Sequence, residues 1–572
     1  MHFSPRPNRA HEIDWQPWSA AAFDRARAEN KPVLLSISAV WCHWCHVMDE
    51  TSYSDPNVIA AINADYVPVR VDNDRRPDVN ARYNQGGWPT TAFLTPDGAL
   101  MAGGTYLPPP QMLGALGQIR DFYRENREQI HERAQSIRSE RASRTAQPGD
   151  VGAGIVAVVL HAIEAQFDEE YGGFGMEPKF PMTDVLELLL QEWRVQRSQR
   201  LYDMLARTLL AMSSGGMYDH VEGGFFRYST TRDWSVPHFE KMSEDHGALL
   251  RILATLVRET RNPQFRATLT SACTYVRTVL LNGDSGLFAG SQDADEAYFA
   301  LPLEERKKLQ APYVDRTSYS NWSAGLAAAF VMAGNVLEDD ALLGIGIRAL
   351  DALHALRDEN GLLFHVLEPG AEPTIRGLLT DQAAYLRALL DAHGETGEPR
   401  FFERACEMAD EIVASFAAGG GGFYDHASIE EQIGNLDLRE RPLSDNAVIA
   451  DCFLRLAALT HEGRFRELAH ATLAYYAQAY ERSGIFAAAY ARAVRRYTQP
   501  AATLEIAGAP DETRDLREAA LRLPVPLLAI RTGAPHDGQE SAHAYYCIGE
   551  QCAPPAASAT ELRAAFEALT PA

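Results

Sequence analysis

The sequence predicts a multidomain protein with a small α/β domain at the N-terminus, an all-α (α/α)6 toroid in the middle, and a small α/β segment at the C-terminus. Three observations predict this fold class. An apolar run of strand length ends at two closely spaced cysteines. A turn made of glycine and an aromatic residue then recurs among helical patterns. Two further strand-like runs close the chain. We expect the domains to cover residues 1–148, 149–498 and 499–572.

The N-terminal domain is predicted from a short alternation of helices and strands. Ser19 precedes a run of alanines and suits an N-cap. Asp55 suits the N-cap of a second helix, because Pro56 then occupies the first helical position. The expected strands cover residues 33–38, 66–71 and 91–95. The first of them is an uninterrupted apolar run, which favours a buried strand.

Cys42 and Cys45 lie where this first strand gives way to a helical pattern. Cysteines three apart on the first turn of a helix have Cβ atoms about 5–6 Å apart, so they can form a disulfide with little backbone movement. The positive end of the helix favours the thiolate of Cys42. We expect Cys42 to be the exposed nucleophile, Cys45 the buried resolving partner, and His43 a second group that stabilises the thiolate. Such a pair in an α/β domain is typical of a thioredoxin-like fold.

Three other interpretations of the cysteine motif stay open. Cys42-x-x-Cys45-His46 has the spacing of a c-type haem attachment site, which normally requires export, and the N-terminus carries no apolar signal segment. Cys42, His43, Cys45 and His46 offer zinc ligands, but ligands so close in sequence cannot easily close a tetrahedron. The pair can also be purely structural. We favour redox chemistry and expect no metal and no cofactor.

Bulk properties narrow the partners and the compartment. The net charge of -24 disfavours nucleic acid and anionic membranes, because both repel an acidic surface. No apolar run reaches the roughly 18 residues of a membrane span. Seven cysteines in 572 residues are not a secreted disulfide framework. Cys273, Cys406 and Cys452 fall in apolar helical patterns and are expected to be buried. We therefore predict a cytoplasmic protein.

A repeated turn predicts the toroid. Between about residue 150 and residue 497 the chain is nearly all helical pattern, and six turns place a glycine before an aromatic residue. The turns lie at residues 172–174, 223–225, 286–288, 361–364, 421–423 and 484–486. Each interval has room for two helices, so six helical hairpins are expected to close into a ring. Glycine is expected in these turns because helices commonly end with a left-handed residue.

Polar residues near helix ends in this region are candidates for a sugar pocket. The candidate substrate-binding residues are Asp219, His220, Trp234, His238, Glu240, His246, Asp293, Asp295 and Asp381, with Asp245 and Asp425 as further carboxylates. Paired carboxylates could act on a glycosidic bond, and a histidine pair could move a proton at a sugar C2 position. The candidates for stacking on sugar rings are Trp234, Phe239, Trp322 and Phe225. The competing interpretation is structural, because such groups also cap helices and form ion pairs, as Lys241 and Asp245 would at i,i+4.

The C-terminal segment is predicted to hold two strands, at residues 503–508 and 525–530, around a helix at residues 511–523. Cys547 and Cys552 follow them. These two cysteines could bridge each other, bind a metal or stay idle. A disulfide relay between them and the N-terminal pair is a further hypothesis.

A series of motifs along the chain resembles one known family. They lie at residues 14–18, 41–48, 86–89, 93–98, 178–181, 215–220, 236–242 and 379–383, with the C-terminal cysteine pair. Together they look like the spermatogenesis-associated-protein-20-like family, which occurs widely in bacteria and animals. The resemblance implies an N-terminal thioredoxin-like domain and a six-hairpin glycosidase-like toroid, with Pro89 as the cis-proline that faces the cysteine pair. Ser36 stands where ordinary thioredoxins hold a buried aspartate that helps to deprotonate the resolving thiol.

These observations lead to one functional prediction and two alternatives. We predict a thioredoxin-like protein with thiol–disulfide capacity at Cys42 and Cys45, coupled to a glycosidase-like toroid that recognises carbohydrate. The first alternative is a carbohydrate epimerase, isomerase or glycoside hydrolase in which the thioredoxin-like domain is a scaffold. The second is a binding protein without turnover. The expected partners are protein thiols or a small carbohydrate, with no nucleic acid and no membrane.

Overall fold

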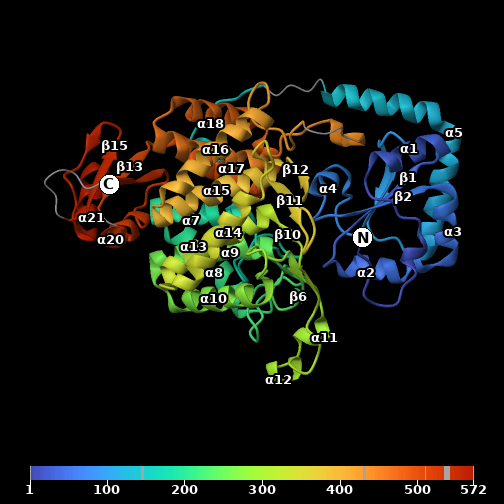
Figure 1. Ribbon diagram of the computed structural model, residues 1–572, viewed down its shortest axis with the longest axis horizontal. Coiled ribbons are helices and arrows are strands. Elements are labelled where there is room, and N and C mark those ends of the chain that lie inside the picture. Colours follow the sequence, from blue (N-terminus) through green and yellow to red (C-terminus); the bar gives the residue numbers. More distant parts are fainter. Residues whose placement is uncertain (1, 143–146, 429–432, 509, 534–540, 571–572) are drawn as a thin grey trace. The chain divides into compact units, whose positions relative to one another are not determined.

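The computed structural model describes residues 2–142, 147–428, 433–508, 510–533 and 541–570 (Figure 1). Its residues cluster into two compact units. The first unit holds residues 1–145 with two short segments from later in the chain, 292–295 and 428–440. The second unit holds the remainder, including the C-terminal segment. Within the described residues, no helix combines the length and the apolar character needed to cross a membrane.

A four-stranded sheet in the order β2-β1-β3-β4 forms the centre of the first unit. β1 is parallel to β2 and antiparallel to β3, and β3 is antiparallel to β4. The elements are η1 (Ala10–Glu12), α1 (Ala20–Glu29), β1 (Val33–Ser38), α2 (His43–Glu50), η2 (Ser52–Ser54), α3 (Pro56–Asp65), β2 (Val67–Asp72), α4 (Pro77–Tyr83), β3 (Thr90–Leu94), β4 (Leu100–Gly104) and α5 (Pro109–Ala142). Every residue of β1 is buried, as expected of a central strand covered on both faces. The predicted thioredoxin-like fold is confirmed.

Local capping explains where two of these helices begin. The Ser19 hydroxyl accepts a hydrogen bond from the Ala22 amide at 3.4 Å. The Asp55 carboxylate accepts one from the Asn57 amide at 2.8 Å. Both N-caps are where the sequence predicts them. The sequence does not predict β4, because this half-exposed strand lacks an apolar run and ends in two glycines.

A segment from far along the chain completes the core of the first unit. Leu436 is fully buried in an apolar cluster that also contains Tyr83 and Leu94. The Tyr83 hydroxyl donates to the Gly98 carbonyl at 2.7 Å and accepts from the Asn435 amide at 2.8 Å. Nothing in the sequence signals this long-range packing, because it joins residues more than 300 positions apart.

Six inner helices of the second unit pack in a closed ring, because each contacts the next and the last contacts the first. The inner helices are α7 (Thr183–Gln196), α9 (Ser243–Thr260), α13 (Ser320–Leu337), α15 (Leu379–Thr396), α17 (Leu443–Thr460) and α19 (Ala488–Thr498). The helices that alternate with them along the chain are α6 (Gly154–Gln166), α8 (Gln199–Ser214), α10 (Pro263–Tyr275), α14 (Asp340–Ala355), α16 (Pro399–Phe416) and α18 (Gly463–Tyr476). The predicted (α/α)6 toroid is confirmed.

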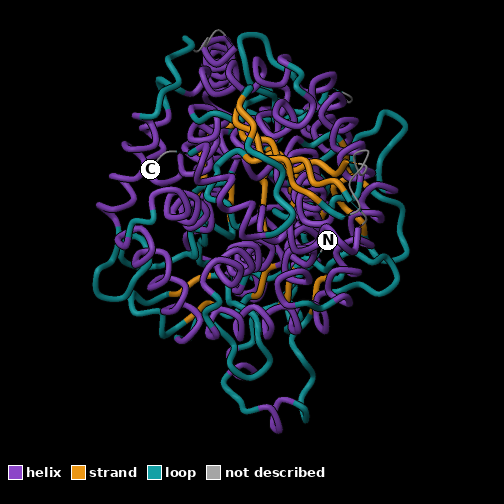
Figure 2. Tube along the Cα trace, turned by 90° about the vertical axis from the view of Figure 1, so that its left-hand side faces the viewer, coloured by secondary structure: helices purple, strands orange, loops and turns teal. Residues whose placement is uncertain are grey.

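Short strands and turns join these helices. They are β5 (Tyr228–Ser229), β6 (Pro237–His238), β7 (Lys241–Met242), η3 (Val276–Leu280), β8 (Ser291–Gln292), β9 (Val314–Asp315), β10 (Ser318–Tyr319), β11 (Phe364–Leu367), β12 (Thr374–Arg376), η4 (Gly434–Asp437) and η5 (Tyr480–Ala487). A loop with two single-turn helices, α11 (Glu296–Phe299) and α12 (Leu303–Arg306), projects from the helical body of the second unit (Figures 1 and 2).

The glycine-aromatic turns have a common hydrogen-bond pattern. After α8, the Gly223 amide donates to the Asp219 carbonyl at 2.8 Å, and the Asp219 amide donates to the Gly224 carbonyl at 3.0 Å. The same two bonds recur after α6 at Asp168. Gly223 and Gly224 have φ angles of +83° and +86°, in the left-handed region that favours glycine. The structure therefore explains the repeat by which the sequence predicts the toroid.

The C-terminal segment repeats the strand order of the first unit. Its sheet runs β14-β13-β15-β16, with β13 parallel to β14 and antiparallel to β15. The elements are β13 (Ala502–Ala507), α20 (Pro510–Leu521), β14 (Leu528–Gly533), β15 (His543–Ile548), β16 (Gln551–Cys552) and α21 (Ala559–Leu569). The strand predicted at residues 525–530 begins three positions later, and the sequence does not predict β15 and β16. The segment packs against the inner helices α15 and α17.

Candidate functional site

Cys42 and Cys45 form a disulfide on the first turn of α2, with their Cα atoms 5.2 Å apart. Cys42 is the N-cap of the helix, and its sulfur accepts a hydrogen bond from the Cys45 amide at 3.2 Å. The cysteine therefore meets the amide donors and the positive end of the helix dipole, as the sequence predicts. In the reduced protein the same position would stabilise a thiolate on Cys42.

Both cysteines are buried, with 4% of Cys42 and 2% of Cys45 exposed. The expectation that Cys42 is exposed is therefore wrong. The residues around it explain this, because Trp41 is also buried and donates to the Asp74 carboxylate at 2.7 Å. The exposed aromatic group of the motif is Trp44, which is 49% exposed. Cys42 is therefore covered by its neighbours, whereas the Trp44 side chain beside it faces solvent.

The peptide bond between Trp88 and Pro89 is cis, which agrees with the geometry implied by the family resemblance. Trp88 also contacts Trp41 edge-on, with ring centroids 5.6 Å apart. His43 is half-buried and lies edge-on to Trp44 at 6.0 Å. Rings that neighbour the two cysteines in the sequence thus make two edge-on contacts.

His46 is a residue of this turn to which the redox prediction gives no role. Its ring is buried, and its Nε2 atom has no hydrogen-bond partner among the described residues. Burial, with a smaller effect from His2, lowers the pKa of His46 to about 4. The ring is therefore neutral at physiological pH. The structure shows no cluster of three metal-ligating side chains in the part of the chain that it describes.

Ser36, which stands where ordinary thioredoxins hold a buried aspartate, lies in a group of three buried hydroxyls. Ser36 on β1 lies opposite Thr91 on β3 in the sheet register. The hydroxyl groups of Ser36, Thr91 and Tyr53 are buried, and those of Ser36 and Thr91 interact with the Tyr53 hydroxyl. Burial raises the pKa of Tyr53. Ser36 is not ionised, so it cannot take a proton from Cys45 as the buried aspartate of ordinary thioredoxins does.

In the toroid, Asp219 belongs to a buried ion pair. Its carboxylate lies 2.8 Å from Lys241 Nζ and 2.7 Å from Arg306 Nη1. Burial opposes ionisation, but the charge of Lys241 and the hydrogen bond from Arg306 together lower the pKa of Asp219. Lys241 also donates to the Gly223 carbonyl at 2.8 Å. Lys241 thus pairs with Asp219, and not with Asp245 at i,i+4.

Trp234 is fully buried and does not offer a face to a sugar. Its indole nitrogen donates to the Tyr171 carbonyl at 3.2 Å, and its ring fills the space beside Gly173. The expectation of a stacking role for Trp234 is therefore wrong. Phe225 is buried too, whereas Phe239 and Trp322 are half-buried.

His246 is occupied on both ring nitrogens by backbone groups. Its Nε2 accepts a hydrogen bond from the Phe225 amide at 2.9 Å, and its Nδ1 donates to the Met242 carbonyl at 2.6 Å. Burial lowers the pKa of His246 to about 4, so the ring is neutral. His220 is exposed, and its Nε2 lies 3.1 Å from the Gly215 carbonyl. Both histidines therefore contact turns of the fold.

His238 and Glu240 form a close imidazole–carboxylate pair. His238 Nδ1 lies 2.5 Å from Glu240 Oε1, and the imidazole stacks on Tyr228 with centroids 4.9 Å apart. Glu240 is 1% exposed, and its second oxygen has no hydrogen-bond partner among the described residues. A carboxylate held this way orients an imidazole.

Carboxyl groups gather at the N-terminal first turns of the inner helices. They are Asp184 on α7, Glu244 and Asp245 on α9, Asp381 on α15 and Asp445 on α17. Asp245 and Asp445 are both half-buried. Partial loss of hydration, together with the charge of Glu244, raises the pKa of Asp245 to about 7. The same effect and the charges of Asp381 and Asp425 raise the pKa of Asp445 to about 7. Asp184 contributes to the raised pKa of both Glu244 and Asp445, so it links the α9 and α17 carboxyls.

Asp381 forms a second histidine–carboxylate pair, with His365. His365 Nδ1 lies 2.9 Å from the Asp381 carboxylate, which also accepts from the Asn321 amide at 3.1 Å. His365 and Asp381 are both buried. The functional prediction omits Asp184, Glu244, His365 and Asp445. The sequence held a sign of three of them. Asp184, Glu244 and Asp445 each lie on the first turn of the helix that follows a glycine-aromatic turn.

Asp293 and Asp295 do not belong to this group. Residues 292–295 cluster with the first unit, whereas the carboxyls described above are all in the second unit. Asp293 is buried and accepts a hydrogen bond from the Ala294 amide at 2.8 Å. Asp425 is half-buried, and its backbone carbonyl accepts from the Leu379 amide at 2.8 Å.

Comparisons with known proteins agree with this architecture. Residues 6–141 match the family model Thioredox_DsbH, described as "Protein of unknown function, DUF255". The chain is 26% identical to spermatogenesis-associated protein 20 of Homo sapiens over an alignment of 703 residues, which covers 96% of this chain and 89% of that protein. It is 33% identical to the thiol:disulfide interchange protein DsbD of Pseudomonas fluorescens over 81 residues, 14% of each chain.

The toroid has a solved structural relative. The structure of cellobiose 2-epimerase from Spirochaeta thermophila superposes with a TM-score of 0.50 and 15% sequence identity, covering 64% of this chain and 96% of that one. At this identity the match supports the fold of the toroid and not its chemistry. The predicted resemblance is confirmed: the chain is similar to spermatogenesis-associated protein 20 over most of its length, with a thioredoxin-like domain that matches the Thioredox_DsbH model and a toroid that has the fold of cellobiose 2-epimerase.

Proposed function

We propose that the protein carries out thiol–disulfide exchange at Cys42 and Cys45. The observation that carries this proposal is the disulfide at the N-terminus of α2, in which the Cys42 sulfur already accepts a helix amide. The similarity of part of the chain to a thiol:disulfide interchange protein supports it. We keep the cytoplasm as the proposed compartment and protein thiols as the proposed partners.

The exchange is written with a dithiol substrate. A substrate thiolate attacks the Cys42 sulfur, the Cys42–Cys45 bond breaks, and Cys45 leaves as a thiolate that takes up a proton. The second substrate thiolate then attacks the substrate sulfur of the mixed disulfide, and Cys42 leaves. The substrate loses two electrons and the protein gains them, and the reverse direction uses the same steps. The helix N-terminus favours Cys42 as the leaving group because it stabilises the thiolate.

The test equilibrates the protein with glutathione redox buffers and measures the reduced fraction by thiol alkylation and mass spectrometry. A Cys547→Ser/Cys552→Ser background removes the second disulfide, so that one pair is counted. We expect a two-electron transition and, in Cys45→Ser, a mixed disulfide of glutathione at Cys42. A Cys42→Ser variant is the matched control and should form none at Cys45. Absence of both the transition and the mixed disulfide would refute the proposal.

A second proposed function concerns the toroid. We propose that the first-turn carboxyls bind a small carbohydrate and move a proton on it. The supporting observation is that carboxyls on the first turns of separate inner helices act on one another, and the pKa values of Asp245 and Asp445 are raised to about 7. Asp245 also feels the charge of Glu240, which pairs with His238. A carboxyl with such a pKa can act as a general acid near neutral pH.

This second function is tested by incubating hexoses and disaccharides in heavy water with the full chain and following deuterium at C2 by NMR. Exchange, epimerisation or hydrolysis that disappears in Asp245→Asn and in Asp445→Asn would support it. Asp233→Asn, at an exposed aspartate, is the matched control. If no sugar changes and none binds, the toroid has no role of this kind.

A further inference from the structure

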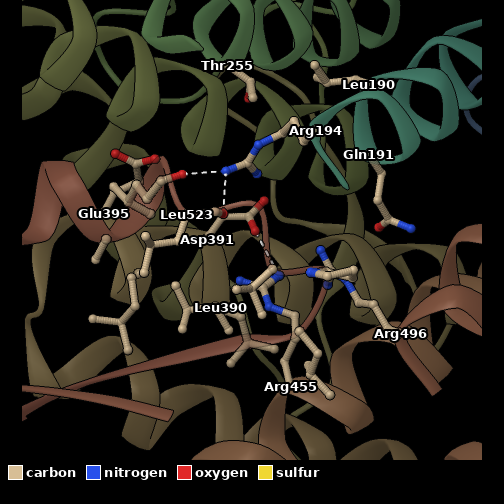
Figure 3. A pocket seen from close by; sticks show the side chains of 18 of the residues that line it. Leu190, Gln191, Arg194, Thr255, Leu390, Asp391, Glu395, Arg455, Arg496 and Leu523 are labelled. Carbon is tan, nitrogen blue, oxygen red and sulfur yellow. Dashed lines mark hydrogen bonds and ion pairs between the residues drawn. The ribbon is translucent and has the colours of Figure 1, made fainter. Parts of the chain in front are cut away.

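A cavity of about 240 Å³ lies inside the second unit, away from the first-turn carboxyls. The inner helices line it together with residues between 520 and 530 of the C-terminal segment (Figure 3). Apolar side chains such as Leu390 and Leu523 form part of its wall, and guanidinium groups form much of the rest. In Figure 3, Arg455 and Arg496 lie around Asp391 in this wall. Its volume is just below the roughly 300–1,000 Å³ of typical small-molecule sites, so it has room only for a small ligand.

The arginines at the centre of the cavity outnumber their carboxylates. Glu187 accepts hydrogen bonds from Arg387 at 2.7 and 2.8 Å, pairs with Arg492, and lies 3.3 Å from Arg251. Asp391 accepts a hydrogen bond from Arg455 at 2.8 Å and lies 3.4 Å from Arg251. Four guanidinium groups thus share two carboxylates by direct contact. The charge of Asp184 also acts on Arg492 from outside the lining, so this centre carries one positive charge more than it has negative ones.

The other arginines in the wall are balanced. Arg194 has Glu259 at 2.8 Å, Arg258 has Glu395 at 2.7 and 2.8 Å, and Arg496 has Asp451 at 2.7 Å. His393 does not add charge, because burial lowers its pKa. The surplus is therefore confined to the centre described above.

Two of the central guanidiniums keep donors unused. The Nε atoms of Arg251 and Arg492 are buried and have no hydrogen-bond partner among the described residues, and Arg492 is only 5% exposed. Burial, together with the charge of Arg387, lowers the pKa of Arg251 to about 9. Burial also lowers the pKa of Arg492 to about 10. Asp391 Oδ2 makes no hydrogen bond within the described part of the chain and lies 3.4 Å from Arg251.

We propose that this cavity binds a phosphate dianion, either inorganic phosphate or the phosphate of a small phosphomonoester. A dianion offsets the surplus charge, and its oxygens accept from the unused Nε donors, a geometry that guanidinium groups favour. The apolar wall accommodates the carbon part of an ester. The site is distinct from both proposed functions and does not depend on them. The positive charge of this site is opposite in sign to the net charge of the chain, which is -24.

The test measures thermal unfolding of the full chain with inorganic phosphate, with a hexose 6-phosphate, and with the unphosphorylated hexose, against sodium chloride at equal ionic strength. We expect a saturable rise in Tm with one or both phosphates and none with the hexose or chloride. An equal response to both phosphates identifies inorganic phosphate as sufficient. A tighter response to the ester identifies a phosphomonoester as the ligand.

The variants Arg251→Gln and Arg492→Gln decide whether the binding is at this cavity. Each should weaken binding by about ten-fold or more, because each loses a charged donor. Arg464→Gln is the matched control, since Arg464 forms ion pairs on the surface with Asp410 and Glu462. Without ligand, Arg251→Gln should keep or raise the Tm, because it removes a surplus charge.

Two results would overturn the proposal. One is the absence of a saturable response to either phosphate in the unmodified chain, checked by phosphorus NMR line broadening, which needs no variant. The other is a response that survives in both Arg251→Gln and Arg492→Gln. A fall in the ligand-free Tm of Arg251→Gln by several degrees would instead show that this arginine is a structural partner, and would also count against the surplus charge.

Discussion

The Nε2 atom of His246 accepts a hydrogen bond from the backbone amide of Phe225 at 2.9 Å. His246 is the fourth residue of α9, and the fourth residues of three other inner helices make the same kind of bond. Ser323 accepts from the Phe288 amide, Gln382 from the Leu363 amide, and Asn446 from the Phe423 amide. The polar side chain at this position of each helix thus accepts a hydrogen bond from a glycine-aromatic turn, although the four side chains are of different types.

The first prediction follows from this role of His246. Replacing it with alanine leaves the Phe225 amide without its acceptor in a buried place, which costs about 1–3 kcal/mol of unfolding free energy. Gln382 fills the same role on α15, so His246→Gln should recover part of the loss. Urea unfolding measures both. His220→Ala, at an exposed histidine, should change the unfolding free energy little, and an equal loss there would contradict the assignment.

The second prediction concerns pH and the first-turn carboxyls. The pKa of Asp245 and of Asp445 is raised to about 7, so the folded protein binds these protons more tightly than the unfolded chain does. Stability attributable to them is therefore full at low pH and is lost as the pH rises from about 4 to about 7. Asp245→Asn and Asp445→Asn should flatten this dependence and raise the urea midpoint at pH 7.5 relative to the unmodified chain.

The control for this pH series is Asp233→Asn. Hydrogen bonds from Ser235 and Thr231 lower the pKa of Asp233 to about 2, so its titration lies below the window. The urea midpoints of this variant at pH 5 and pH 7.5 should differ by as much as those of the unmodified chain. If Asp245→Asn keeps that same difference, its carboxyl does not titrate near neutrality.

The third prediction concerns the reduced form of the cysteine pair. We expect alkylation of Cys42 in reduced Cys45→Ser to follow a thiol pKa below the ordinary value of about 8.5, because Cys42 caps α2. The rate should nevertheless be slow, since only 4% of Cys42 is exposed. The rate of iodoacetamide labelling against pH separates the two effects. A thiol pKa at or above about 8.5 would remove the electrostatic basis of the proposal.

The fourth prediction concerns the second disulfide. Cys547 and Cys552 are bonded and lie directly opposite each other on β15 and β16, with Cα atoms 4.1 Å apart. The bond closes a very short loop within a hairpin, so it adds at most about 2 kcal/mol to the unfolding free energy. Cys547→Ser/Cys552→Ser should therefore stay folded. If hydrogen exchange shows that the C-terminal segment of this variant is destabilised by much more than about 2 kcal/mol, the disulfide has a larger structural role.

The relay between the two cysteine pairs stays a prediction. Cys552 is exposed and Cys547 is half-buried, so the C-terminal pair is open to attack. Peptide mapping of Cys45→Ser would reveal a mixed disulfide between Cys42 and either of them. A map that contains only glutathione adducts at Cys42 would exclude the relay.

Local chemistry explains what could be predicted from the sequence. The N-caps at Ser19 and Asp55, the cysteine pair on the first turn of α2 and the glycine turns all depend on residues within a few positions of one another. The toroid followed from the recurrence of such turns. The Cys547–Cys552 bridge was one of three options left open, and the structure selects it.

The sequence by itself determined the thioredoxin-like domain, the helical ring and the position of the redox pair, because short-range capping, turn geometry and periodicity encode them. Only the tertiary structure decided which polar groups are free to act. It buried Trp234 and Cys42, occupied both nitrogens of His246, and brought carboxyls from separate helices to one end of the ring. It also set four arginines around two carboxylates. Burial and charge balance depend on contacts between distant residues, which no local pattern records.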